Sequence, residues 1–329
     1  MRVLKTSAIL ALIWSVFGLA GCDTAAPDAI ESAPERAEKA QILEEFDAAL
    51  ATAQSTSGPG EPVLWTLSDE DTDIYMFGTV HLLRPDLAWR TEAFDTALDA
   101  ADTIVFEVDM DSEKAQRAIA TDFLTRGVFQ DGRTLRDVLS DEDEAVISAA
   151  FESLGVPFDA INTFEPWMAS INLSMMSISQ DGYDPESGVE RVIYRDVRDA
   201  GKQFAYLETI NDQADAFDLL PEADQVSMLY ETALLLEESP RMLDLLVEEW
   251  ADGDMAGIEA LMANSEAHGF TDAAYQSVLV KRNQNWLPKI EAMLDEPGTF
   301  LIAAGAGHFA GPDSVIAMLR EKGYTIEGP

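Results

Sequence analysis

Residues 305–313 read GAGHFAGPD, and residues 78–86, far upstream, read GTVHLLRPD. Gly, His, Pro and Asp recur in both segments at the same internal spacing. The chain has only 3 histidines, and two of them, His81 and His308, occupy the matched position 227 residues apart. This agreement indicates that the same type of turn occurs twice in the fold.

The two segments share a predicted secondary-structure context. An apolar run typical of a buried strand precedes each one, at residues 74–77 and 299–304. A helical pattern and a second apolar run follow each one, and in the C-terminal copy we expect Asp313 as the N-cap and Gly323 as the helix stop. We therefore predict an α/β (α+β) fold whose central mixed β-sheet comes from two pseudo-repeated β-GxxH-α-β units at the chain ends.

Further segments complete this sheet. Residues 63–67 and 74–77 flank a polar turn and predict a β-hairpin. Residues from about 113 to 295 form a large, mainly helical insertion, which includes a helix predicted over residues 184–201. Residues 203–208 are the exception, because QFAYLE predicts a strand. The sheet is therefore expected to receive one strand from the middle of the chain.

The overall composition limits the possible partners. The chain has 329 residues, of which 47% are hydrophobic, so it can form a substantial core. Its 21 Lys and Arg against 61 Asp and Glu give a formal net charge of −40. Such a surface argues against nucleic acid, whose phosphates need a basic face, and against peripheral binding to anionic lipid. It favours solubility and the attraction of cations.

The N-terminus predicts a bacterial lipoprotein signal. Arg2 and Lys5 precede a short apolar run, which ends in LAGC at residues 19–22, a sequence that resembles a lipobox. We expect cleavage before Cys22 and a lipid on its thiol. Because Cys22 is the only cysteine in the chain, no internal disulfide and no thiolate ligand are then available.

This signal sets the predicted organisation and location. The expected parts are a signal peptide over residues 1–21, a lipid-anchored flexible tether over 22–62, and one domain over 63–329. The anchor places the protein in the bacterial cell envelope, facing the periplasm. Asp23 after the lipidated Cys favours the inner membrane.

The residues that could carry chemistry gather around the strand ends. In α/β sheets ligands bind at the carboxyl ends of the strands, so we expect His81 and His308 to meet at one edge. Two neutral imidazoles suit a divalent metal. Glu107, predicted in the middle of a strand over residues 103–109, needs a partner because an unpaired carboxylate is costly to bury. Glu208 ends the strand over 203–208 in the same way.

Three further residues have weaker support. Glu190 lies near a predicted helix N-terminus, which favours a carboxylate with or without a function. Arg282 and Asn283 lie in a polar helical segment before the last long strand. Arg282 there neutralises either a carboxylate or an oxyanion, or lies on a solvated face; the pattern leaves these alternatives open.

Several motifs together resemble one protein family. They are LW at residues 64–65, FGTVH at 77–81, FE at 106–107, LET at 207–209, RNQNW at 282–286 and GAGH at 305–308. Over residues 62–327 the chain resembles the TraB/PrgY/GumN family, whose animal members, the Tiki proteins, are membrane-tethered metalloproteases. The family's fold is shared with erythromycin esterases and a haem-binding ChaN-like group. The resemblance implies a metal site of His81, His308 and Glu107, with Glu190 and Glu208 as further candidates.

The leading hypothesis is a metal-dependent, peptidase-like hydrolase with a peptide or small-molecule substrate. A divalent ion, with Mn, Co and Zn all open, would lower the pKa of a bound water and polarise a carbonyl group. Glu190 or Glu208 would act as general base, and Arg282 or Asn283 would stabilise the oxyanion.

Two alternatives use the same residues. The first is a non-catalytic lipoprotein that binds a peptide or small ligand in the same cleft. The second is a haem- or iron-binding protein with His81 or His308 as axial ligand. Turnover separates the first alternative from the hydrolase, and the absorption spectrum on haem titration tests the second.

Overall fold

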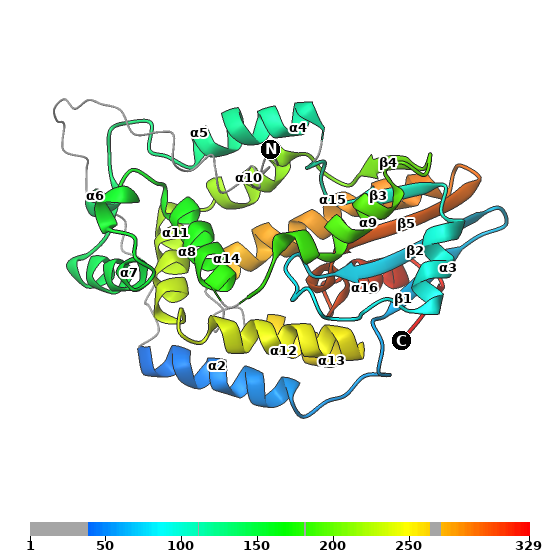
Figure 1. Cartoon of the computed structure of the whole chain (residues 1–329), viewed down its shortest axis with the longest axis horizontal. Helices are drawn as coiled ribbons and strands as arrows, with labels where there is room; N and C mark the ends of the chain where they lie inside the picture. Colours follow the sequence, from blue (N-terminus) through cyan, green and yellow to red (C-terminus); the bar gives the residue numbers. More distant parts are fainter. Residues whose placement is uncertain (1–38, 111, 181, 264–270) are drawn as a thin grey trace, which may run out of the picture.

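The computed structural model describes residues 39–110, 112–180, 182–263 and 271–329. The predicted signal peptide and Cys22 lie outside these residues. In the described part of the chain, no helix is both long and apolar enough to cross a membrane. Figure 1 shows a β-sheet at one end of the molecule and a group of helices at the other.

One six-stranded sheet has the order β4-β3-β5-β2-β1-β6. Its strands are β1 (Leu64–Ser68), β2 (Thr72–Thr79), β3 (Thr103–Phe106), β4 (Gln203–Tyr206), β5 (Gly298–Gly305) and β6 (Ile326–Glu327). β4, β3, β5 and β2 run parallel, whereas β1 pairs antiparallel with β2 and with β6. The predicted mixed sheet, the hairpin and the strand from the middle of the chain are confirmed.

The register of β2 and β5 places the two GxxH turns side by side. The strands are parallel neighbours, with Gly78 opposite Ala304 and Thr79 opposite Gly305. Both strands therefore end at the same edge of the sheet, and each leads directly into its histidine. The repeated motif marks two adjacent strand ends although 227 positions separate His81 from His308.

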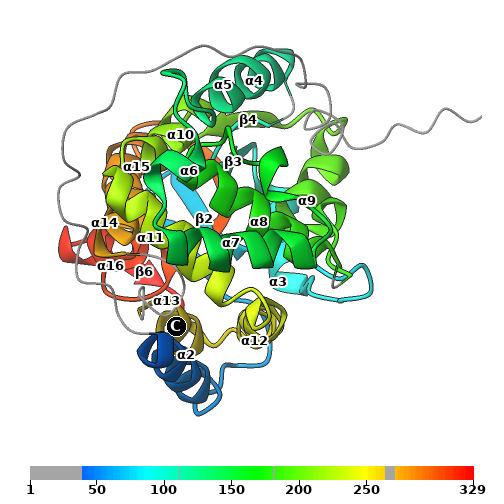
Figure 2. The ribbon, with the colours of Figure 1, turned by 90° about the vertical axis from the view of Figure 1, so that its left-hand side faces the viewer.

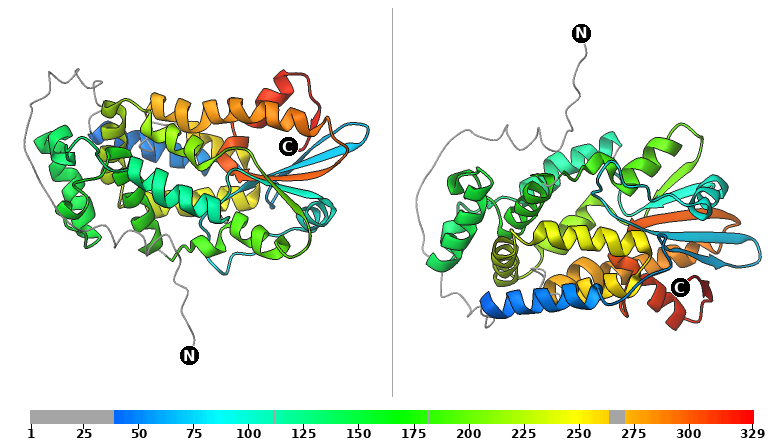
Figure 3. Two further views of the ribbon diagram at one scale, coloured as in Figure 1. Left: turned by 90° about the horizontal axis from the view of Figure 1, so that it is seen from above. Right: turned by 60° about the horizontal axis from the view of Figure 1, so that its bottom comes forward.

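Helices cover both faces of the sheet. On one face, α15 (Lys281–Met293) and α16 (Val315–Glu321) pack against the strands. On the other face lie α3 (Glu92–Ala100), α9 (Val189–Val197) and α12 (Ser239–Asp252). Figure 3 shows the sheet between these layers. Alternation along β5 explains both cores, because Leu301 and Ala303 face one layer while Ile302 and Ala304 face the other.

The helical end of the molecule has its own cores. α7 (Asp141–Ser153), α8 (Pro166–Gln180) and α11 (Glu222–Leu234) pack around Phe151 and Leu173, and Figure 2 views this end from the front. α2 (Lys39–Ala53) falls within the segment predicted as a tether. It packs beside α13 (Met255–Ala263), with Phe46 and Leu261 in a shared core.

Shorter elements connect these layers. They are α4 (Glu113–Ala118), η1 (Ile119–Phe123), α5 (Leu124–Arg126), α6 (Leu135–Val138), η2 (Phe158–Ala160), η3 (Pro185–Ser187), α10 (Ile210–Asp218), α14 (Asp272–Tyr275), η5 (Gln276–Val280) and η6 (Ala306–Phe309). η1 and η5 are π-helical turns, and the other η elements are 3-10 turns.

Several predicted boundaries are corrected. β3 ends at Phe106, so Glu107 follows the strand and does not lie in its middle. Ser314, not Asp313, caps α16 by accepting the Ala317 amide, while Gly323 ends it with a φ of +97° as expected.

The helix predicted over residues 184–201 is also corrected, because it is broken in two. η3 ends at Ser187 and α9 begins at Val189. Between them, a Cβ on Gly188 would lie 2.1 Å from the carbonyl oxygen of His81, so only glycine allows this approach. The break thus brings the start of α9 against the first GxxH turn.

Candidate functional site

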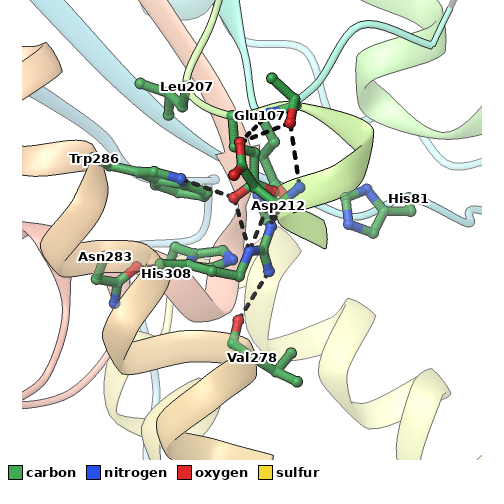
Figure 4. Close-up of polar contacts among 12 residues, drawn as sticks. His81, Glu107, Leu207, Asp212, Val278, Asn283, Trp286 and His308 are labelled. Carbon is green, nitrogen blue, oxygen red and sulfur yellow. Dashed lines mark hydrogen bonds and ion pairs between the residues drawn. The ribbon is translucent and has the colours of Figure 1, made fainter. Parts of the chain in front are cut away.

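The two histidines and Glu107 surround one point above Gly305. A Cβ built on Gly305 would lie 3.2 Å from Glu107 Oε1, 3.6 Å from His81 Nε2 and 3.7 Å from His308 Cδ2. Figure 4 shows how the side chains of His81, Glu107 and His308 lie, and β2, β3 and β5 end at this edge of the sheet. The absence of a side chain at Gly305 leaves room for the three groups to face one another.

His308 is buried and held in one orientation. It lies in η6 with 5% of its surface exposed, and its ring contacts that of Trp286 in a tilted arrangement at a centroid distance of 4.2 Å. Its Nδ1 lies 2.6 Å from Asn283 Oδ1, while Asn283 Nδ2 donates to the Asp313 carbonyl at 2.8 Å. Because this second bond fixes the amide, Nδ1–H of His308 donates and Nε2 carries the lone pair. Burial lowers the pKa of His308 to about 3, so the ring is neutral.

His81 has the opposite environment. Its side chain is 64% exposed, and its Nδ1 lies 2.7 Å from Glu190 Oε1. The Thr79 hydroxyl also donates to Glu190 Oε1. Glu190 raises the pKa of His81 to about 9, an effect that water around the exposed ring screens in part. His81 is therefore the cationic, solvent-facing member of the pair.

Arg282 joins the two buried carboxylates. Its Nη2 lies 2.6 Å from Glu107 Oε2 and 2.6 Å from Glu208 Oε1, and its Nε lies 3.0 Å from Glu208 Oε2. The Trp286 indole also donates to Glu208 Oε2 at 3.1 Å. Both oxygens of Glu208 are thus bonded, and the residue is 6% exposed. This geometry makes Glu208 an anchor for Arg282.

Glu107 stays ionised although it is buried. Burial opposes its charge, but His308, Arg282 and His81 and a 2.6 Å hydrogen bond from the Gly305 amide lower its pKa to about 2. Because His308 is neutral, the positive charges of Arg282 and His81 and the Gly305 N–H are the main causes. Oε2 binds Arg282, and Oε1 faces the two imidazoles.

A π-helical turn positions Arg282 and Asn283. η5 ends at Val280, and α15 begins with Lys281. The Val278 carbonyl in this turn accepts a 2.9 Å hydrogen bond from Arg282 Nη1. π-Helical turns recur at functional sites because they redirect the side chains that follow. Asn283 is fully buried and binds His308 and Asp313, so it acts on the orientation of His308.

The structure thus brings all seven predicted residues into one network. They are His81, Glu107, Glu190, Glu208, Arg282, Asn283 and His308. Three further contributors were not singled out from the sequence as site residues: Thr79, Gly188 and Trp286. Thr79 stands between the Gly and His of its own GxxH motif, and Trp286 stands in the RNQNW motif. Their places inside these two motifs were the sequence signal that could have identified Thr79 and Trp286.

The donor types fit a divalent metal. Two imidazoles and a carboxylate surround one point, and each imidazole has its Nδ1 held by an oxygen acceptor. Metal-binding histidines in proteins have such outer partners, which orient the ring and leave Nε2 for the ion. Among the described residues, however, no group of three or more His, Cys, Asp or Glu side chains has the spacing of a metal site.

Comparison with known proteins now decides the family. The profile of the TraB/PrgY/gumN family matches residues 63–328. The chain belongs to the TraB/PrgY/gumN family. The resemblance predicted from the GxxH motifs is thereby confirmed, and the matched region includes all seven site residues.

Relatives in the TraB/PrgY/gumN family are distant. An uncharacterized protein of Treponema pallidum (strain Nichols) is 20% identical over 80% of this chain and 81% of its own. The uncharacterized protein YbaP of Escherichia coli (strain K12) is 21% identical over 75% of this chain and 87% of its own. Human "Metalloprotease TIKI1" is 26% identical over 38% of this chain and 30% of its own. No solved structure matches.

Proposed function

We propose that this protein is a metal-dependent hydrolase that acts on peptides. The observation that carries the proposal is the meeting of His81 Nε2, the His308 ring and Glu107 Oε1 around Gly305. The name of the TIKI1 relative, a metalloprotease, supports the same reaction class.

His81, His308 and Glu107 would hold the ion, and His81, which is cationic without a metal, would lose its Nε2 proton when the ion binds. His308 offers the lone pair of Nε2 because Asn283 occupies Nδ1. Glu107 offers Oε1, and Arg282 keeps it ionised. A divalent ion bound there would lower the pKa of a bound water and polarise the scissile carbonyl. The preferred ion among Mn, Co and Zn is left to experiment.

The remaining residues have distinct tasks. Glu190 holds His81 by Nδ1 and is the carboxylate nearest the exposed side, which makes it our candidate for general base. Arg282 supplies positive charge beside Glu107, but Glu208 and Glu107 already occupy its donors. Substrate is expected to approach from the side of His81, because His308 and Asn283 are buried.

We also propose where the hydrolase acts. A lipid on Cys22 would hold it at the periplasmic face of a bacterial membrane, with Asp23 favouring the inner membrane. Incorporation of labelled fatty acid into the full chain, lost in Cys22→Ser, tests the anchor. Equal labelling of both proteins would contradict it.

The central experiment measures metal and turnover together. His81→Ala and His308→Ala, singly and combined, are compared with wild type for bound metal after Mn, Co or Zn loading, and for cleavage of a peptide library. We expect the double variant to lose both. His268→Ala is the control histidine, because His268 belongs to neither GxxH motif.

The outcomes separate the hypotheses. Stoichiometric metal in the double variant would contradict the site. A wild-type protein that binds metal and peptide, but cleaves nothing, would contradict the hydrolase and favour the binding-protein alternative.

A further inference from the structure

A cavity of about 490 Å³ opens beside the loop that carries His81. Arg84, Asp86 and Leu87 of this loop line one side of it. Helix α12 lines the other side, and the indole of its Trp250 donates to the Gly78 carbonyl at 2.8 Å. The elements that shape the cavity therefore also hold the first GxxH turn. A volume of this size accommodates a side chain of a bound ligand.

The inner surface of the cavity is largely apolar. Leu87, Val247 and Ala251 contribute to it together with the buried ring of Tyr183. The methylene stem of a long side chain could pack along such a surface while its polar end stays at the mouth.

Two charged residues in the cavity wall, Arg84 and Asp244, form an ion pair with each other. Arg84 lies 2.6 Å from Asp244 Oδ1, and its guanidinium carbon lies 4.9 Å from the centre of the Tyr183 ring. The Tyr183 hydroxyl donates to the same Asp244 oxygen at 2.6 Å. Arg84 and Asp244 neutralise each other, so neither supplies net charge to a ligand. The contact does show that a face of the Tyr183 ring accepts a guanidinium.

The remaining charges at the mouth are all negative. Asp86, Glu248 and Asp252 line the cavity, and Asp252 Oδ2 accepts the Gly58 amide at 2.7 Å. Asp86 and Glu248 are exposed, and among the described residues neither has a hydrogen-bond or ion-pair partner for its carboxylate. Two carboxylates therefore point to solvent at the mouth of a cavity with an apolar interior.

We propose that this cavity is the subsite for a basic side chain, lysine or arginine, of a peptide bound at the candidate site; the assignment rests on the proposed peptide hydrolase. The stem of the basic residue packs on Leu87, Val247 and Ala251, and its charged head pairs with Asp86 and Glu248. The net charge of −40 adds a long-range attraction for cationic peptides.

The test compares two labelled peptides that differ in one charge. Both have the same alanine-rich sequence around a central arginine or a central citrulline, which is neutral and has nearly the same shape. Binding to the full chain is measured by fluorescence anisotropy, and cleavage is measured separately. We expect wild type to bind the arginine peptide more tightly, and Asp86→Asn/Glu248→Gln to reduce that preference about 3- to 10-fold. Raised salt should shrink the preference as well.

A matched variant controls for net charge. Glu70→Gln/Glu321→Gln removes the same number of exposed carboxylates from the β1–β2 turn and the end of α16, away from the cavity. It should keep the preference for arginine. Equal preference in wild type and Asp86→Asn/Glu248→Gln, or an equal loss in the control variant, would overturn the subsite.

Binding and cleavage fail independently. If neither peptide is cleaved by wild type at any metal loading, the hydrolase proposal fails, while the anisotropy still decides the subsite. If peptides are cleaved without preference for arginine, the hydrolase stands and the subsite falls.

Discussion

The two GxxH turns place the same residue type in opposite environments. His308 is 5% exposed, bound to an amide and neutral. The side chain of His81 is 64% exposed, bound to a carboxylate and cationic. The motif fixes where each strand ends, but a distant helix, α15 for His308 and α9 for His81, supplies the partner. The pseudo-repeat thus repeats the backbone turn at the end of a strand. The hydrogen-bond partner that sets the charge of each histidine comes from a helix far away in the chain.

Replacing Arg282 tests the buried network with Glu107 and Glu208 that the two turns share. Arg282→Met leaves Glu107 and Glu208 buried without their cation, so we expect a loss of about 3–5 kcal/mol in the free energy of unfolding. Urea unfolding measures it. Arg117→Met, which removes the exposed pair with Glu113, is the control and should leave stability nearly unchanged. Similar midpoints for both variants would show that the buried carboxylates do not depend on Arg282.

Removing the Nδ1 partner of each histidine tests the difference directly. Asn283→Ala leaves a buried Nδ1–H and the Asp313 carbonyl unpaired, which should cost about 1–3 kcal/mol of unfolding free energy. Glu190→Ala, made in a Thr79→Val background so that no buried hydroxyl loses its acceptor, frees an exposed ring and should cost about 1 kcal/mol or less. Urea unfolding of both variants gives the two values. Equal losses would break the contrast between a buried and an exposed turn.

Substitution of the first glycine in each GxxH motif should also have different effects on stability and on peptide cleavage. A Cβ on Gly78 would lie 3.1 Å from Ala306 Cα, so Gly78→Ala presses on the backbone of the second turn and should cost about 1–3 kcal/mol. A Cβ on Gly305 meets side-chain atoms of Glu107, His81 and His308 instead. Gly305→Ala should therefore lose less stability but reduce peptide cleavage by about tenfold or more. Thermal unfolding and a cleavage assay separate the two effects, and the reverse ranking would contradict them.

The strand ends could be predicted because their signals are local. A short apolar run, a glycine and a histidine define each turn within ten residues. In the structure the two turns lie side by side because β2 and β5 are parallel neighbours. The need of Glu107 for a partner also followed from its apolar neighbours. That the partner is Arg282, 175 positions away, depends on how α15 packs, which no local pattern contains.

The errors have the same origin. The segment from Asp184 predicts one helix because proline favours a helix start and the apolar spacing continues. It breaks at Gly188 because the carbonyl of His81 approaches from another part of the chain. The burial of His308 likewise depends on Trp286 and α15, so the matched GxxH motifs predict no difference between the two histidines.

Glu190→Gln changes the charge of the first turn with the least effect on the fold. In the metal-free protein, histidine ring NMR should place the pKa of His81 above 6.5 in wild type, by less than burial would give because water screens the exposed ring, and closer to 6.5 in the variant, while His308 stays neutral down to about pH 3. Because the folded pKa of His81 is raised, its stabilising contribution is complete below pH 6.5 and is lost as pH rises through the raised pKa of the folded protein. Glu190→Gln should therefore flatten the fall in unfolding free energy over that range, and Glu186→Gln, on the neighbouring η3, should not. A wild-type His81 that already titrates near pH 6.5 would mean that Glu190 orients the ring without holding its proton, and the two turns would then differ in burial alone.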